Sequence, residues 1–205
     1  FTLSGGNLAV IAAMDNLALL GEGASAGDGE EADHFAGENP WLFLSVEGAG
    51  QIAESIAAGM MALDPAYEGL YAENLAAFEA GLDALKAEMR AEVGEPSRKR
   101  VALLHEGLGY LADELGLLAV ATLRREPGEA LYGDELEDFI AALRDSGAQV
   151  ALVERQAPQT LCRAIEAAGL TIAKIDTLTT GFAADPQAYF QAMRGNARAI
   201  AQALA

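Results

Sequence analysis

Hydrophobic and polar positions follow two different rhythms along the chain, and the change falls near residue 100. After it, four short apolar runs each precede a segment in which apolar residues recur at helical spacing. The apolar runs are 100–105, 117–122, 148–154 and 170–175, and the helical segments are 107–115, 133–146, 158–168 and 186–204. Strands alternating with helices are typical of a parallel sheet covered on both faces. The pattern predicts an α/β fold with a four-stranded parallel βα lobe over residues 95–205.

Before residue 100 the pattern is mainly helical. Ser45 suits the N-cap of a helix whose apolar positions recur as far as Leu63, and Asp64-Pro65 signals that one helix ends and another begins. The second helix, over 64–94, carries one long apolar stripe and would extend roughly 40 Å at the standard rise per residue. We therefore expect two helices end to end with a bend, the second being a long linking helix.

Residues 1–63 hold too few strand-like runs for a second complete lobe, so we interpret them as the remainder of an N-terminal lobe. Within them, residues 21–38 are rich in Gly, Ala, Ser and acids and contain almost nothing to bury. This composition predicts an exposed, mobile acidic loop, whose one distinctive residue is His34. Asn39-Pro40 then marks a turn.

Composition and charge exclude several classes of function. Hydrophobic residues make up 52% of the 205-residue chain, which is enough for a folded core. A formal net charge of −18 repels phosphate backbones and anionic membranes, so we expect no nucleic acid partner. Cations are the natural counter-species, although acids that solvate helix faces explain the same charge. No apolar run is long enough to span a bilayer, and the single Cys162 lies in a helical pattern that predicts a buried apolar role.

Three of the apolar runs end on one ionisable residue each: His105, Glu154 and Asp176. If these runs are neighbouring parallel strands, the three side chains converge at the carboxyl edge of one sheet, where open α/β folds bind their ligands. One imidazole and two carboxylates are donors that zinc and manganese take. The pattern therefore indicates a divalent metal site.

Each of these residues also has a plain structural interpretation. His105 precedes a glycine-containing turn and can serve as a polar turn residue. Glu154 can pair with the neighbouring Arg155 or cap the following helix. Asp176 can form an Asx turn over the residues that follow it. The residues alone leave both interpretations open.

Nothing in the sequence supports classical catalysis. No Ser or Cys has a plausible base and orienting group, and Gly107-Leu108-Gly109 does not extend to a dinucleotide fingerprint. An enzyme that uses His105 with a carboxylate as acid and base is therefore the weakest hypothesis. We predict a binding protein rather than an enzyme.

The order of these pieces resembles the metal-binding substrate-binding proteins of ABC transporters, the zinc and manganese receptors also described as adhesion lipoproteins. The resemblance covers about residues 39–205. It rests on the Asn39-Pro40 turn, the helix that ends in Asp64-Pro65, the long second helix, the strand that ends in His105 before Gly109-Tyr110, the strands that end in Glu154 and Asp176, and Met193-Arg194-Gly195-Asn196 in the terminal helix.

This resemblance implies two lobes joined by a rigid helix, with zinc or manganese held in the cleft between them. By the resemblance, His105 and Asp176 are ligands from the second lobe, and Glu154 supports the site. Trp41 stands where the family has a metal-ligating histidine after Asn-Pro, so it lines the cleft without ligating. His34 is the candidate replacement for that histidine.

The function that follows is an extracytoplasmic solute-binding component, periplasmic or lipid-anchored at the cell surface. It would deliver zinc or manganese to the membrane permease of an ABC importer. We expect much of the first lobe to be missing from this chain. A second hypothesis keeps the fold but drops the metal: a degenerate member that acts as an interaction or adhesion module, or binds another solute against Trp41.

Overall fold

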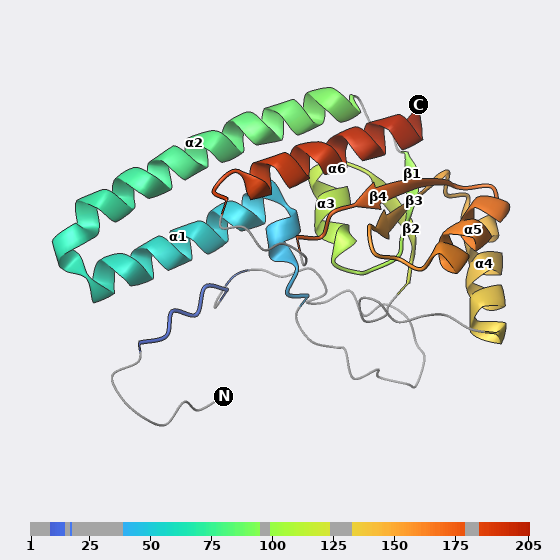
Figure 1. The fold of residues 1–205 in the computed structure, drawn as a ribbon, viewed down its shortest axis with the longest axis horizontal. Coiled ribbons are helices and arrows are strands. Elements are labelled where there is room, and N and C mark those ends of the chain that lie inside the picture. Colours follow the sequence, from blue (N-terminus) through green and yellow to red (C-terminus); the bar gives the residue numbers. More distant parts are fainter. Residues whose placement is uncertain (1–8, 15–16, 18–38, 95–98, 124–132, 179–184) are drawn as a thin grey trace.

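A four-stranded parallel sheet forms the centre of the C-terminal half of the chain (Figure 1). The computed structural model describes residues 9–14, 17, 39–94, 99–123, 133–178 and 185–205. The strands are β1 (Arg100–Leu103), β2 (Leu118–Thr122), β3 (Val150–Glu154) and β4 (Thr171–Ile175), in the order β2-β1-β3-β4. All three neighbouring pairs run parallel, so the predicted α/β fold and the parallel βα lobe are confirmed.

Alternating strand residues build a separate core on each face of the sheet. Leu103 of β1 and Leu152 of β3 face the core formed with α2 (Glu68–Val93), α3 (Leu108–Glu114) and α6 (Ala188–Leu204). Leu104 and Val153 face the second core, formed with α4 (Asp134–Ser146) and α5 (Gln159–Ala167). Cys162 is buried in this second core, as predicted. The central strands β1 and β3 can be short apolar runs because helices remove both of their faces from water, whereas the edge strands β2 and β4 keep exposed positions.

The first two long helices form a hairpin rather than an end-to-end strut. Helix α1 (Val46–Leu63) is followed by the single 3₁₀ turn η2 (Pro65–Tyr67) and then by α2, which packs back against α1 (Figure 1). Asp64 and Pro65 do mark the helix boundary, but the chain reverses there. Helix α2 also lies against α6, so it joins the hairpin to the sheet half.

The apolar stripe of α2 is buried only in its C-terminal half. Leu82, Leu85 and Met89 are buried, whereas Leu70 is 51% exposed and Tyr67, in η2, is 57% exposed. The sequence pattern predicts one continuous buried stripe, which is wrong for the part of the helix near the hairpin turn. In the hairpin α2 packs against α1 (Figure 1).

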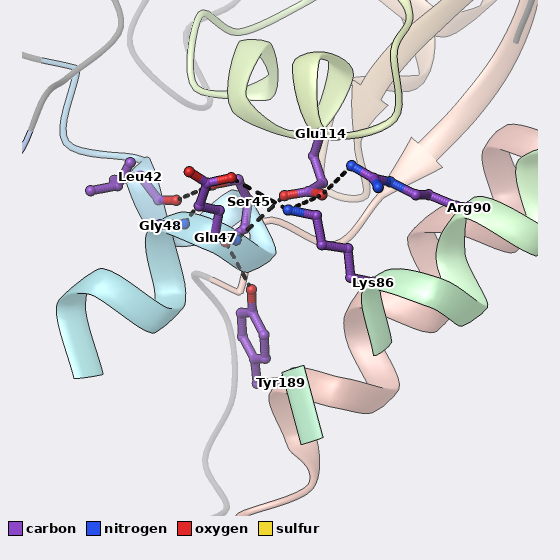
Figure 2. A network of polar contacts seen from close by, with 8 residues as sticks. All are labelled: Leu42, Ser45, Glu47, Gly48, Lys86, Arg90, Glu114 and Tyr189. Carbon is purple, nitrogen blue, oxygen red and sulfur yellow. Dashed lines mark hydrogen bonds and ion pairs between the residues drawn. The ribbon is translucent and has the colours of Figure 1, made fainter. Parts of the chain in front are cut away.

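Helix α1 begins as the sequence predicts. The Ser45 hydroxyl accepts the backbone N–H of Gly48 at 2.9 Å, which satisfies a donor left unpaired at the helix start. The 3₁₀ turn η1 (Leu42–Leu44) comes directly before this cap. The Tyr189 hydroxyl of α6 lies 3.1 Å from the Ser45 carbonyl, so the cap is anchored to the terminal helix (Figure 2).

A buried carboxylate joins α3 to both helices of the hairpin (Figure 2). The Glu114 side chain is 4% exposed, and its Oε1 lies 3.4 Å from Lys86 Nζ and 3.7 Å from Arg90 of α2. Its Oε2 accepts the backbone N–H of Glu47, in the first turn of α1, at 3.4 Å. Because α3 directly follows the loop that carries His105, this network fixes that loop relative to the hairpin.

The predicted mobile loop at 21–38 lies outside the described residues. The division into 1–63, 64–94 and 95–205 stays a prediction. In the described part of the chain, no helix is both long and apolar enough to cross a membrane.

Candidate functional site

The strand ends named from the sequence lie next to one another at one edge of the sheet. Strand β3 lies between β1 and β4, with Leu103 opposite Leu152 and Glu154 opposite Ile175. His105 follows β1 closely, Glu154 ends β3 and Asp176 follows β4. The three residues therefore share the carboxyl edge of the sheet. Among the described residues, no hydrogen bond or ion pair joins His105 to either carboxylate.

His105 is a buried, uncharged imidazole. It is 3% exposed, and burial lowers its pKa below the ordinary value of 6.5. Its Nδ1 accepts the backbone N–H of Gly107 at 3.0 Å, so the proton of the neutral ring is on Nε2. His105 thus makes, through Nδ1, the hydrogen bond expected of a polar turn residue. A metal would take an Nε2 lone pair only after this ring proton moved or left.

Trp41 packs edge-on against His105. The ring centroids are 4.6 Å apart and the planes meet at 78°. Gly107 makes this approach possible, since a Cβ there would lie 2.4 Å from Cγ of Trp41. The aromatic side chain thus closes one side of the imidazole.

Two hydrogen bonds fasten the Asn39 turn to the segment that follows His105, and a third closes the turn itself. Its side-chain amide donates to the Glu106 carbonyl at 3.2 Å, and its Oδ1 accepts the N–H of Trp41 at 3.1 Å. The Tyr110 hydroxyl donates to the Asn39 carbonyl at 2.9 Å. From the sequence, Asn39 is a turn signal and part of the Asn-Pro element of the family resemblance, and its bonds to Glu106 and Tyr110 are not predicted. The signal for the wider role was the pairing of Asn-Pro with a tyrosine soon after the histidine.

Asn196 holds the backbone of Asp176 in place. Buried Asn196 of α6 accepts the Asp176 N–H at 2.8 Å and donates to the Asp176 carbonyl at 2.9 Å. The carboxylate Oδ1 accepts the N–H of Leu178 at 2.9 Å, so the predicted Asx turn is present. Leu178 adopts φ 61°, a left-handed conformation that is uncommon for a branched side chain.

Arg155 forms an ion pair with the other carboxylate oxygen of Asp176. The guanidinium Nη1 lies 2.7 Å from Asp176 Oδ2. The interpretation that Arg155 pairs with its neighbour Glu154 is therefore wrong. Consecutive residues of an extended strand point to opposite faces, so Arg155 and Glu154 cannot meet easily. Arg155 instead pairs with the residue beside it on the next strand.

Glu154 is buried and turned toward the loop after β4. It is 6% exposed, and its Oε1 accepts Thr177 Oγ1 at 3.4 Å and Gln156 Nε2 at 3.3 Å. Burial raises the pKa of Glu154, while the bond from Thr177 opposes the shift. A carboxyl group in this setting ties the ends of β3 and β4 together.

The donors at this edge fit a divalent metal only in part. Imidazole and carboxylate are suitable ligands for zinc or manganese, and the Asp176 backbone is already fixed. Both groups have protein partners, however. In the described residues, no three His, Cys, Asp or Glu side chains gather closely enough to hold a metal ion. His34 lies outside the described residues.

A model of the family described as zinc-uptake complex component A, periplasmic, matches residues 2–203. The chain belongs to this family. The suspected relation to zinc and manganese receptors is thereby confirmed. No curated protein matches the sequence significantly.

Several solved structures resemble the chain over nearly its whole length. A mutant of FpvC from Pseudomonas aeruginosa is 26% identical, with a TM-score of 0.77, and the match covers 95% of this chain and 70% of that one. FpvC in complex with Mn²⁺ is 24% identical, with a TM-score of 0.77, covering 95% and 69%. A zinc-bound deletion mutant of ZnuA is 23% identical, with a TM-score of 0.67, covering 94% and 68%. The chain thus spans about 70% of the length of these proteins.

Proposed function

We propose that this chain is part of the solute-binding component of an ABC importer for zinc or manganese, working outside the cytoplasm. The observation that carries the proposal is the family match over residues 2–203. Similar proteins have been solved with Mn²⁺ and with zinc bound. The metal would be the cargo handed to a membrane permease.

His105 and Asp176 are the proposed metal ligands of this half of the site. Support comes from their place at one sheet edge, from the uncharged state of His105, and from the Asn196 hydrogen bonds that fix the Asp176 backbone. Glu154 is assigned a supporting role because its bonds go to Thr177 and Gln156. Further ligands are proposed to come from outside the described residues, with His34 the candidate in this chain.

Calorimetric titration of the natural full-length protein with zinc and with manganese tests the proposal. Asp176→Asn should weaken binding at least tenfold, because a carboxylate ligand is lost. Glu166→Gln removes a carboxylate from an exposed position of α5 and should leave affinity unchanged. Binding no tighter than millimolar by the unmodified protein would end the metal assignment. Equal losses in the two variants would remove Asp176 from the site.

A further inference from the structure

Arg155 places a positive charge where a metal ligand is expected. Its guanidinium lies 2.7 Å from Asp176 Oδ2, a distance typical of a strong charge-assisted hydrogen bond. The opposite oxygen already accepts the Leu178 N–H. Both oxygens of the carboxylate therefore have donors before any cargo arrives.

The sheet itself brings the two residues together. Glu154 is paired with Ile175, and the Arg155 N–H donates to the Ile175 carbonyl at 3.0 Å, so the parallel ladder continues one residue past β3. Arg155 and Asp176 are consequently direct neighbours at the ends of the adjacent strands β3 and β4, on the same side of the sheet. The contact is built into the register rather than made by a chance rotamer.

We propose that Arg155 is an internal competitor for the cation at Asp176, so that a divalent metal engages this carboxylate only by displacing the guanidinium. The inference rests on the proposed function, because it concerns the same carboxylate. It makes Arg155 a residue that sets the affinity of the site rather than a ligand.

Exposure makes the guanidinium a competitor rather than a permanent block. The Arg155 side chain is 62% exposed, whereas that of Asp176 is 18% exposed. An ion pair with one well-solvated partner is weak and is screened by salt, so the guanidinium can swing into water at small cost. Asp176 stays in place because Asn196 holds its backbone.

This competition raises the intrinsic affinity that a cation needs in order to occupy Asp176. A cation must attract Asp176 more strongly than the guanidinium does before it gains the carboxylate. Divalent ions that bind oxygen and nitrogen donors tightly can do so, whereas monovalent ions at ordinary concentrations interact too weakly. Arg155 thereby lowers the affinity for every cation by a similar factor, so ions that already bind weakly stay largely unbound at ordinary concentrations.

Zinc titration of Arg155→Gln in the full-length protein tests the proposal. Loss of the guanidinium should tighten zinc binding by about tenfold at low salt, since the ion pair and the repulsion of the metal both disappear. Arg155→Lys keeps the charge and should stay within about threefold of the unmodified protein. Raising the salt concentration should narrow the difference between Arg155→Gln and the unmodified protein.

Arg163→Gln is the matched control, because it removes an exposed arginine from α5 and changes the net charge equally. Its zinc affinity should match that of the unmodified protein. If the unmodified protein binds zinc and Arg155→Gln binds no more tightly, the competition is overturned while the proposed function stands. If neither zinc nor manganese binds to any variant, both the competition and the proposed function fall. A similar gain in Arg163→Gln would assign the effect to overall charge and also overturn the proposal.

Discussion

Burial shifts the pKa values of His105 and Glu154 in opposite directions, and both shifts favour the uncharged form. The two groups lie at the ends of neighbouring strands. Asp176 lies between Arg155 and the Leu178 N–H, and each donates a hydrogen bond to one of its carboxylate oxygens. The sheet edge therefore offers an incoming cation one anchored negative charge and a neutral imidazole.

The titration of His105 follows from its burial. The folded chain takes up the second ring proton of His105 only at lower pH than the unfolded chain does. The contribution of the neutral ring to the free energy of unfolding is therefore full above pH 6.5. It is lost as the pH falls through the lowered pKa of the folded state. Proton NMR of a His34→Gln variant isolates the signal, since the chain has two histidines. We expect a midpoint below 6.5. A midpoint at or above that value would mean that water reaches the ring.

Asn196 is expected to be the residue that orders the carboxylate. Asn196→Ala removes both hydrogen bonds to the Asp176 backbone and should lower the free energy of unfolding by about 2 kcal/mol. It should also weaken metal binding, although Asn196 is not a proposed ligand. Gln191→Ala, at an exposed position of the same helix, is the control for both measurements. Unchanged metal affinity in a destabilised Asn196→Ala protein would show that Asp176 needs no such support.

At the scale of elements, the start of α3 meets the η1 region at the contact of Gly107 with Trp41. Gly107→Ala places a methyl group 2.4 Å from the indole Cγ, so one of the two segments must move. We expect a loss of about 2 kcal/mol in unfolding free energy and a red shift in tryptophan emission, which reports Trp41 alone. A Cβ at Gly195 in α6 would meet no atom within 4 Å. Gly195→Ala should therefore leave the tryptophan emission unchanged and should not lower the free energy of unfolding.

Sequence pattern was sufficient for the strands and insufficient for the hairpin. The apolar runs that end in His105 and Glu154 are strands with both faces buried, and a run of apolar residues encodes that directly. The run before Asp176 is an edge strand with Lys174 exposed, and its apolar residues still predict it. Asp64-Pro65 encodes a helix boundary but not the direction in which the chain leaves it. The contact of α1 with α2 depends on tertiary packing, which local spacing does not contain.

The same distinction explains what was missed at the site. The position of Asp176 at a strand end is local information, and the sequence gives it. Its partner Arg155 depends on the register between β3 and β4, which is a long-range property. Likewise, the bonds of Asn39 to Glu106 and Tyr110 cross nearly 70 residues of sequence. No periodicity within one element reports such contacts.

At the scale of the whole molecule, charge opposes compactness. The chain carries 31 acidic and 13 basic residues, a formal charge of −18, so like charges repel one another in the folded state. Raising sodium chloride from about 10 mM to about 300 mM should increase the thermal unfolding midpoint by several degrees, because salt screens this repulsion. Choline chloride at equal ionic strength should act similarly. A midpoint that falls with both salts would mean that attractive ion pairs, such as those of Glu114, outweigh the net repulsion.

Helix α2 is one continuous element with two different surroundings, and this sets a gradient of local stability along it. Its C-terminal half packs against α6 and the core, whereas its first turns, near Leu70, have an exposed apolar face. Backbone amides near the hairpin turn should therefore exchange with deuterium through local opening, while those from Leu82 to Val93 should exchange only through wider unfolding. The hairpin end of the helix can fray without disturbing the sheet edge that carries Asp176.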